Sequence, residues 1–293
     1  MGSSTKKPGK SRKKPILSVG TFVTIVATLL LRVFVVQGYS NPTGSMENTI
    51  LPGETMLVNK FIYGAESPTY LPFTDIKIPH FRLPALRLPH RGDIVVFDWP
   101  GMRDQVRPTE QTNYLKRCVG LPGDTIRIID RILYVNGSIL PIPPKEKLET
   151  PYILPGGYEN PDIFPEGSGF NEDNYGPIVI PKQGDRIELT AQNFLKWRIF
   201  IEREGHSCRL ADDRIIIDGV QSSQYVVEQN YYFMMGDNRE NSLDSRFWGF
   251  VPYSSIEGQP ILVYWSWDPD ISYGDIFAKI ASLRWYRIGI VLK

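Results

Sequence analysis

An apolar run near the N-terminus limits the folds open to this chain more than any other feature. Residues 16–36 contain one charged side chain, that of Arg32, and this stretch of 21 residues is long enough to cross a hydrocarbon layer of about 30 Å. Arg32 lies near one end of the run, where a long basic side chain can reach the lipid headgroups. We therefore predict a single transmembrane helix over residues 16–36, with the remaining chain folded close to the membrane.

The charges beside the run predict its orientation. Residues 1–15 hold no acidic side chain and six basic ones, namely Lys6, Lys7, Lys10, Arg12, Lys13 and Lys14. Basic flanks stay on the cytoplasmic side, so we expect a single-pass protein of the cytoplasmic (inner) membrane whose main domain is extracytoplasmic. The alternative, a cleaved signal peptide, would have a shorter apolar region followed by a small-x-small site. Residues 37–40 match such a site poorly, which favours a retained anchor.

Composition indicates the fold class. With 24 prolines, 25 glycines and 42% hydrophobic residues, the chain has enough apolar material for a core but many turns, which favours short strands over long helices. The whole chain carries +1 and its first fifteen residues carry +6, so the rest carries −5, which argues against nucleic acid as a partner. We predict a mainly β protein of one or two domains.

Residues 139–222 differ in composition from the segments on either side. Their first part is rich in Pro, Gly, Glu and Asn, and they contain no paired acids, metal-ligand cluster or phosphate-binding loop. We interpret residues 139–222 as an inserted subdomain, and residues 37–138 with 223–293 as the β core. Within the insert, residues 190–204 are expected to form a helix with Thr190 as its N-cap.

Neither the cysteines nor the histidines form a recognisable site. Cys118 and Cys208 are too few for a disulfide scaffold. Whether they pair depends on the fold and the compartment, and unpaired buried thiols are the favoured interpretation. The three histidines, His80, His90 and His206, show no metal-ligand spacing.

The hexapeptide after the apolar run, residues 41–46, has the composition of a turn that can present a nucleophile. Gly44 permits backbone geometries closed to other residues, and Pro42 fixes one dihedral. Acyl transfer requires a hydroxyl such as that of Ser45, held at a fixed angle beside backbone N–H groups. Taken alone, the hexapeptide fits an ordinary turn leaving a membrane helix better.

A lysine interrupts the apolar strand expected over residues 114–120. Adjacent strand residues face opposite sides, so if Arg117 points outward or to a partner, Lys116 points inward. Burial lowers the pKa of an amine, and a neutral lysine can take a proton from a serine hydroxyl. The alternative is a strand-edge lysine with its ammonium group in water, which is the commoner arrangement for an isolated lysine.

Charged and small polar residues fill the loop 236–249 between two apolar strands. A solvated loop would explain the charges but not the aromatic ending. Asp237 is expected to pair with Arg117. Asp244 and Arg246 lie two residues apart, which on an extended chain places them on one face. Buried pairs of this kind hold geometry more than they stabilise.

Taken together, these segments resemble the bacterial type I signal peptidases (leader peptidases), the membrane-bound Ser-Lys proteases. The matching segments are Thr43-Gly44-Ser45-Met46, Arg91-Gly92-Asp93-Ile94-Val95, Tyr114-Leu115-Lys116-Arg117-Cys118-Val119-Gly120-Leu121-Pro122-Gly123-Asp124, and Gly236-Asp237-Asn238-Arg239 through Trp248-Gly249. The resemblance runs from the anchor to about Val263, apart from residues 139–222. It implies a signal-peptidase-like antiparallel β catalytic core with an inserted subdomain and one transmembrane helix.

The resemblance also implies a serine endopeptidase that removes N-terminal signal peptides from exported preproteins. Ser45 would be the nucleophile and Lys116 the general base. Thr43 would stabilise the oxyanion beside the Ser45 N–H, and Ser242 would orient the amine. The supporting ion pairs would be formed by Arg117, Asp237, Asp244 and Arg246.

By the same resemblance, the chemistry needs no cofactor or metal. The partners it implies are secretory preproteins with small residues before the cut, together with membrane lipid. The secretion translocon is a further candidate partner.

Two positions depart from the family pattern. Asn41 stands where the family usually has an apolar residue that helps line the pocket for small side chains, so the pocket is expected to differ. Asn48 stands where proline is common, and we expect this change to affect turn rigidity only. Neither departure removes a catalytic group.

Two other functions stay open at this point. One is a related Ser-Lys protein that cleaves itself, as regulatory repressors of similar fold do, although the anchor and the lack of a DNA-binding half argue against it. The other is a catalytically inactive, membrane-anchored scaffold that binds exported chains, which the complete Ser/Lys/Ser set argues against.

Two segments outside the motifs could contact lipid. Residues 64–90 read as a long irregular loop with exposed apolar side chains, which either rests on the membrane or is a plain surface excursion. From Asp275, apolar residues at helical spacing predict a short C-terminal helix. It is either a basic amphipathic helix on the membrane surface or a helix packed on the core.

Overall fold

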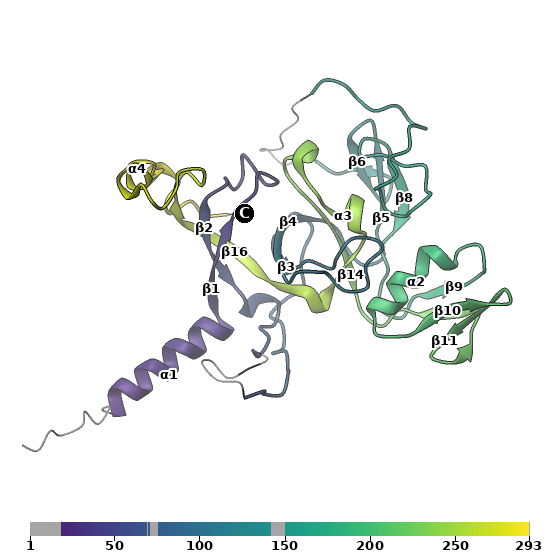
Figure 1. The fold of residues 1–293 in the computed structure, drawn as a ribbon, viewed down its shortest axis with the longest axis horizontal. Coiled ribbons are helices and arrows are strands. Elements are labelled where there is room, and N and C mark those ends of the chain that lie inside the picture. The colour runs from purple at the N-terminus through teal and green to yellow at the C-terminus, as the bar shows by residue number, and fades with distance from the viewer. Residues whose placement is uncertain (1–18, 69, 71–75, 142–149, 293) are drawn as a thin grey trace, which may run out of the picture.

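The computed structural model describes residues 19–68, 70, 76–141 and 150–292 (Figure 1). The basic tail over residues 1–15 and the first three residues of the expected membrane helix, 16–18, lie outside these ranges. The helices are α1 (Val19–Phe34), α2 (Phe194–Arg203), α3 (Ser245–Trp248) and α4 (Ile276–Ala281), with short 3-10 turns at Phe61–Tyr63, Arg239–Asn241, Tyr253–Ser255 and Trp285–Arg287.

Strands dominate the rest of the described chain, as the composition predicted. They are β1 (Val36–Asn41), β2 (Glu54–Asn59), β3 (Ile94–Asp98), β4 (Asn113–Gly120), β5 (Thr125–Ile129), β6 (Ile132–Val135), β7 (Ser138–Ile139), β8 (Tyr175–Val179), β9 (Arg186–Glu188), β10 (Cys208–Ala211), β11 (Arg214–Ile217), β12 (Val220–Gln221), β13 (Gln224–Val226), β14 (Tyr231–Met235), β15 (Val251–Pro252) and β16 (Ile256–Ser266). The chain is therefore mainly β.

A seven-stranded sheet carries the motif segments. Its strand order is β1-β2-β16-β3-β4-β14-β15, and every pairing in it is antiparallel. The long strand β16 bends across the molecule and pairs with β2 along one part and with β3 along another (Figure 1). Because β16 bridges strands far apart in sequence, it brings the N-terminal strands β1 and β2 next to β3 and β4.

A second sheet packs beside the first, with the order β7-β6-β5-β8. Residues Thr125 and Ile126 of β5 pair with Val179 and Ile178 of β8. The expected boundary between the core and the insert, at residues 138 and 139, therefore falls inside this sheet. The largest buried apolar cluster contains side chains from both sides of that boundary, among them Ile126, Ile178 and Phe233.

The remaining part of residues 139–222 forms two small sheets and α2. β10, β11 and β12 make one sheet, and β9 pairs with β13. The predicted start of the helix at Thr190 was wrong, because α2 begins at Phe194 with Asn193 as its N-cap. The Thr190 and Asn193 side chains each accept a hydrogen bond from the other residue's backbone N–H, which forms a turn before the helix.

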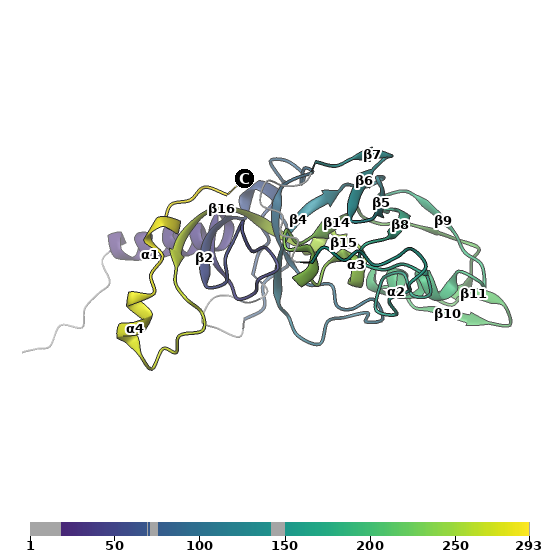
Figure 2. The ribbon, with the colours of Figure 1, turned by 90° about the horizontal axis from the view of Figure 1, so that it is seen from above.

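Helix α1 occupies most of the described part of the expected membrane segment. α1 and α4 lie at one end of the molecule, and β10 and β11 lie at the opposite end, in both views (Figures 1 and 2).

Helix α1 ends at Phe34 and β1 begins at Val36, so the predicted helix end at Val36 was two residues too late. Across the described ranges, no helix combines the length and hydropathy needed to cross a membrane.

Candidate active site

The two residues expected to carry the chemistry lie in contact. Lys116 Nζ donates a hydrogen bond to Ser45 Oγ at 2.5 Å. Ser45 belongs to the turn after β1, and Lys116 lies in the middle of β4. Both side chains are buried, with 6% of Ser45 and 1% of Lys116 exposed. The candidate nucleophile and its candidate base are therefore adjacent and buried.

Strand alternation accounts for the direction of Lys116. Lys116 is paired with Val95 and points to the buried side, whereas its neighbour Arg117 reaches the partly exposed side and bonds to Asp237. The pKa of Lys116 is lowered to about 8, mainly by burial, while the Asp244 carboxylate raises it, Arg246 lowers it and Asp237 raises it. The prediction that Lys116 points inward, with a depressed pKa, agrees with this geometry.

The turn that carries Ser45 is held from within by Asn41. The buried Asn41 side chain donates through Nδ2 to the backbone carbonyls of Ile50 and Leu51, and its Oδ1 accepts from Thr43. This amide closes the segment between β1 and β2 into one loop. Asn41 therefore has a structural task in addition to the pocket-lining position that the resemblance gives it.

Asn48 has a backbone conformation that proline cannot adopt. Its φ is 74°, in the left-handed region, whereas the proline ring fixes φ near −65°. Asparagine tolerates this region better than most residues. A proline at position 48 could not follow the backbone path of this turn. The change from proline to Asn48 therefore affects the path of the turn, whereas we had expected it to affect turn rigidity only.

Asp237 connects the loop that carries Ser45 with β4, the strand that carries Lys116 and Arg117. Arg117 donates to both Asp237 oxygens, from Nε at 2.8 Å and from Nη2 at 2.6 Å. Thr49 Oγ1 donates to the same carboxylate at 2.6 Å, and the Asp237 N–H donates to Met46 Sδ. The predicted Arg117–Asp237 pair is confirmed, and through Thr49 it also fixes the turn that follows Ser45.

Asn238 makes a second connection that the motif analysis did not assign. Its backbone N–H donates to the Ser45 carbonyl at 3.0 Å, and its Nδ2 donates to the Gly44 carbonyl at 3.2 Å. Asn238 itself is fully buried. The only sequence signal for this role was its place in the second motif, directly after Asp237.

Asp244 and Arg246 form the second predicted ion pair. Arg246 donates to the two Asp244 oxygens, from Nε and Nη2, each at 2.9 Å, and both side chains are buried. Burial alone would raise the pKa of Asp244, but the Arg246 charge and hydrogen bonds hold it below its ordinary value. The expected extended backbone holds for Asp244 but not for Arg246, because Asp244 is the N-cap of α3, which contains Arg246, and accepts from the Arg246 N–H.

The two remaining candidate residues differ in their contacts. The hydroxyls of Thr43 and Ser45 lie 3.3 Å apart, so Thr43 is next to the nucleophile. Ser242 Oγ is buried and has no hydrogen-bond partner in the described part of the chain, so its expected bond to Lys116 is not formed here. The orienting role of Ser242 stays a prediction.

Gly236 explains how Ser242 and Ser45 come close. A Cβ atom at Gly236 would fall 2.2 Å from Ser242 Oγ and 2.5 Å from the Ser45 carbonyl oxygen. Both distances are far below van der Waals contact. The loop can therefore bring Ser242 beside the Ser45 segment only because residue 236 has no side chain.

A buried ion pair supports the same loop from the C-terminal side. Arg287 donates to Glu54 from Nε at 2.5 Å and from Nη2 at 2.9 Å, and also to the Thr49 carbonyl. Glu54 is completely buried and accepts from the Leu51 N–H. The sequence analysis did not predict this pair, because its members lie 233 residues apart.

The cysteines and metal-ligating side chains add nothing to the site. Cys118 and Cys208 are free and buried, as the favoured interpretation had it, and burial raises the pKa of both thiols. In the ranges that the structure covers, no group of three or more His, Cys, Asp or Glu side chains is arranged to hold a metal ion.

Comparisons with known proteins agree with the motif assignment. The family described as "Signal peptidase, peptidase S26" matches residues 15–265. Signal peptidase I of Pseudomonas aeruginosa is 32% identical over 290 residues, which cover 94% of this chain and 82% of that protein. Signal peptidase I of Buchnera aphidicola subsp. Schizaphis graminum is 33% identical, covering 84% and 73%, and that of Rickettsia typhi is 30% identical, covering 98% and 97%. The predicted resemblance is thus confirmed, and the chain belongs to the signal peptidase family, peptidase S26, and is a peptidase.

Proposed function

We propose that this chain is a membrane-bound serine endopeptidase that removes signal peptides from exported preproteins with a Ser45–Lys116 dyad. The observation that carries the proposal is the 2.5 Å contact between Lys116 Nζ and Ser45 Oγ in a site that excludes water. A lysine with a pKa of about 8 has a substantial neutral fraction near neutral pH and can act as a general base.

In the proposed mechanism, Ser45 Oγ attacks the scissile carbonyl carbon while neutral Lys116 takes the hydroxyl proton. Lys116 then gives that proton to the leaving amine, the mature protein departs, and the signal peptide remains as an ester on Ser45. A water molecule, deprotonated by Lys116, attacks the ester carbonyl. Return of the proton to Ser45 Oγ releases the signal peptide and restores the free enzyme.

Thr43 and the Ser45 backbone N–H are the proposed oxyanion donors. The Ser45 N–H makes no hydrogen bond within the described chain, so it is available to a substrate oxygen. The Thr43 hydroxyl lies next to Ser45 Oγ. Ser242 has the role of accepting a hydrogen bond from the Lys116 amine once substrate fixes the site, and its unpartnered, buried Oγ supports this assignment.

Two open strand edges support a binding mode for the substrate. β1 is an edge strand, and residues 113–116 of β4 pair only with β3, since β14 pairs with residues 117, 118 and 120. Four successive antiparallel pairings separate β1 from β4, so the two strands run in the same direction. Both lead toward Ser45 and Lys116. An extended peptide that adds to these edges would bring its scissile bond to the dyad.

The direction of the bound peptide follows from the anchor. α1 precedes β1, and the apolar part of a signal peptide precedes its cleavage site. A substrate held in the same membrane would therefore run parallel to β1, from the bilayer toward Ser45. Its small side chains just before the cut would enter shallow apolar pockets beside the dyad, and Asn41 would make these pockets more polar than usual for the family.

The proposed membrane contact extends beyond the anchor. Phe81 of the loop 64–90 stacks on Phe34 at the end of α1, with ring centroids 6.1 Å apart. In α4, Lys279 is buried and donates to backbone carbonyls, whereas 84% of Phe277 is exposed. α4 thus presents apolar rather than basic side chains outward. We propose that the loop and α4 rest on lipid, with the catalytic domain on the extracytoplasmic side.

The test uses the full chain in lipid vesicles with a preprotein substrate. Ser45→Ala and Lys116→Ala should each abolish cleavage, whereas Ser138→Ala and Lys182→Ala, at exposed positions outside the dyad, should leave it unchanged. Turnover by either dyad variant at the wild-type rate would refute the assignment. Cleavage of the chain itself instead of the preprotein would favour the self-cleaving alternative, and binding without cleavage by the wild type would favour the scaffold.

A further inference from the structure

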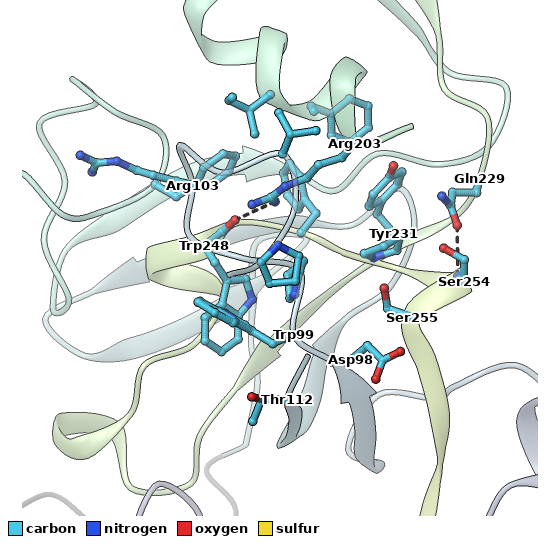
Figure 3. Close-up of a pocket in the computed structure, with 18 of the residues that line it drawn as sticks. Asp98, Trp99, Arg103, Thr112, Arg203, Gln229, Tyr231, Trp248, Ser254 and Ser255 are labelled. Atoms are coloured by element: carbon cyan, nitrogen blue, oxygen red, sulfur yellow. Dashed lines mark hydrogen bonds between the residues drawn. The ribbon is translucent and has the colours of Figure 1, made fainter. Parts of the chain in front are cut away.

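A cavity separate from the dyad lies between the catalytic sheet and α2 (Figure 3). Its volume is about 280 Å³, several times the roughly 30 Å³ that one water molecule occupies in the liquid. Figure 3 shows Trp99, Trp248 and Tyr231 around it, with Arg203 reaching from α2 toward Trp248. The walls are largely aromatic and the rim is polar, which is typical of a ligand site.

Hydrogen-bond donors without partners lie in the walls of the cavity. The indole nitrogens of Trp99 and Trp248 are buried there, and neither has a hydrogen-bond partner in the described chain. Arg203 uses four of its N–H groups to bind backbone carbonyls, those of Gly101, Met102, Gln105 and Trp248. A guanidinium group has five N–H donors, so one is left. A ligand that suits the aromatic walls therefore has apolar bulk, and a carbonyl-type acceptor on it would pair with the remaining Arg203 N–H.

Arg203 also explains why the cavity exists. It belongs to α2 of the inserted residues, yet three of its four acceptors lie in the loop 99–112 of the catalytic core. Burial lowers the pKa of Arg203 to about 10, and no carboxylate of the described residues pairs with it. The insert thus holds the loop that forms one wall.

A single side chain separates this cavity from the dyad. The Tyr114 ring packs against Trp248 and Trp99, with centroid distances of 5.2 and 5.6 Å, and Lys116 Nζ lies 5.6 Å from the centre of the same ring. Thr112, which lines the cavity, directly precedes the open edge of β4. Four residues along a strand, from Lys116 to Thr112, span about 13 Å.

We infer that this cavity is a substrate subsite for a bulky apolar side chain four to six residues before the scissile bond. This inference rests on the proposed function, because it places the peptide parallel to β4 with its upstream end beyond Asn113. Such a peptide supplies both features that the cavity requires, an apolar side chain and backbone carbonyl acceptors. Asp98 at the rim disfavours an acidic side chain at the same position.

The experiment measures kcat/KM for peptides that carry leucine, alanine or aspartate at each position from three to eight before the cut. At one position from four to six, wild-type enzyme should prefer leucine over alanine by about tenfold or more, with aspartate cleaved least. Val106→Trp fills the cavity from its rim and should remove that preference while small-residue selection at the cut persists. Val220→Trp, at an exposed site in β12, is the matched control and should retain it.

The absence of a leucine preference at positions four to six, or its persistence in Val106→Trp, would overturn the subsite alone. No cleavage of any peptide by the wild type would refute the proposed function and the subsite with it. As a second measurement, a benzophenone side chain at the preferred position should crosslink the Ser45→Ala enzyme within the loop 99–112. Crosslinking only to other segments would contradict the subsite.

Discussion

The backbone N–H of Asn238 donates to the carbonyl of Ser45 at 3.0 Å, which ties the second motif to the first. The bond uses backbone atoms, so it fixes the direction of the Ser45 peptide rather than that of the side chain alone. The Ser45 N–H belongs to the preceding peptide, whose Gly44 carbonyl accepts from Asn238 Nδ2 at 3.2 Å, and this N–H makes no hydrogen bond within the described chain. In the proposed mechanism, the Ser45 hydroxyl and backbone N–H are thus oriented before substrate binds, and preorganisation of this kind accounts for much of enzymatic rate acceleration.

Gly236→Ala should nearly abolish activity. The new Cβ would meet Ser242 Oγ at 2.2 Å and the Ser45 carbonyl oxygen at 2.5 Å, so the Ser45 loop has to move. A shift of about 1 Å at a reacting group can cost about 100-fold in rate. The measurement is kcat/KM on a preprotein peptide. Gly156→Ala is the control, since a Cβ there meets nothing within 4 Å, and near-normal activity of Gly236→Ala would contradict the described loop.

Asp237→Asn should lower both stability and activity. It removes the charge that faces Arg117, and breaking a buried pair costs about 3–5 kcal/mol. Thr49→Val removes only the bond between Thr49 and the same carboxylate, and should cost about 1.5–3 kcal/mol. Urea unfolding of both variants in detergent gives the two values. Equal stability of Asp237→Asn and wild type would mean that this carboxylate does not connect the two segments.

Arg287→Met should destabilise the protein although Arg287 lies far from the dyad in sequence. It leaves the completely buried Glu54 without its partner, at an expected cost of about 3–5 kcal/mol. The double variant Glu54→Gln/Arg287→Met removes both charges and should recover most of that loss. If the single variant unfolds at the same urea concentration as wild type, the pair is not buried in solution.

The burial of Lys116 should make stability depend on pH in a defined direction. Its pKa falls from 10.5 in the unfolded chain to about 8 in the folded protein. Between these values the unfolded state binds more protons, so the free energy of unfolding rises with pH from about 8 to 10.5. Lys116→Met should lack this rise. An identical pH dependence in both proteins would place the amine in solvent.

Local rules alone did not predict the dyad, because Ser45 and Lys116 each fit a commoner arrangement, and the family resemblance assigned them as a pair. Strand alternation directed Lys116 inward on the condition that Arg117 points outward or to a partner, and the contact of Arg117 with Asp237 meets that condition. The pair of Asp244 and Arg246 was predicted for a wrong reason. Asp244 caps a short helix, and a carboxylate before a polar loop does not reveal whether the next turn is extended or helical.

Long-range pairings were not predictable from local patterns. β5 pairs with β8 across the expected domain boundary, and Glu54 meets Arg287 from the other end of the chain. Neither contact leaves a local signal in periodicity or turn residues. The task of Asn41 was missed for a related reason, since its partners are backbone carbonyls, which every residue possesses.

The most direct test of the account is the pH dependence of Ser45 acylation. An active-site acylating inhibitor is added to the full chain in detergent, and the rate of modification is followed by mass spectrometry from pH 6 to 11. We predict labelling of Ser45 alone, with a rate that rises about tenfold for each pH unit below a midpoint near 8 and then levels off. A midpoint near the ordinary lysine value of about 10.4, or labelling at a residue other than Ser45, would contradict the account.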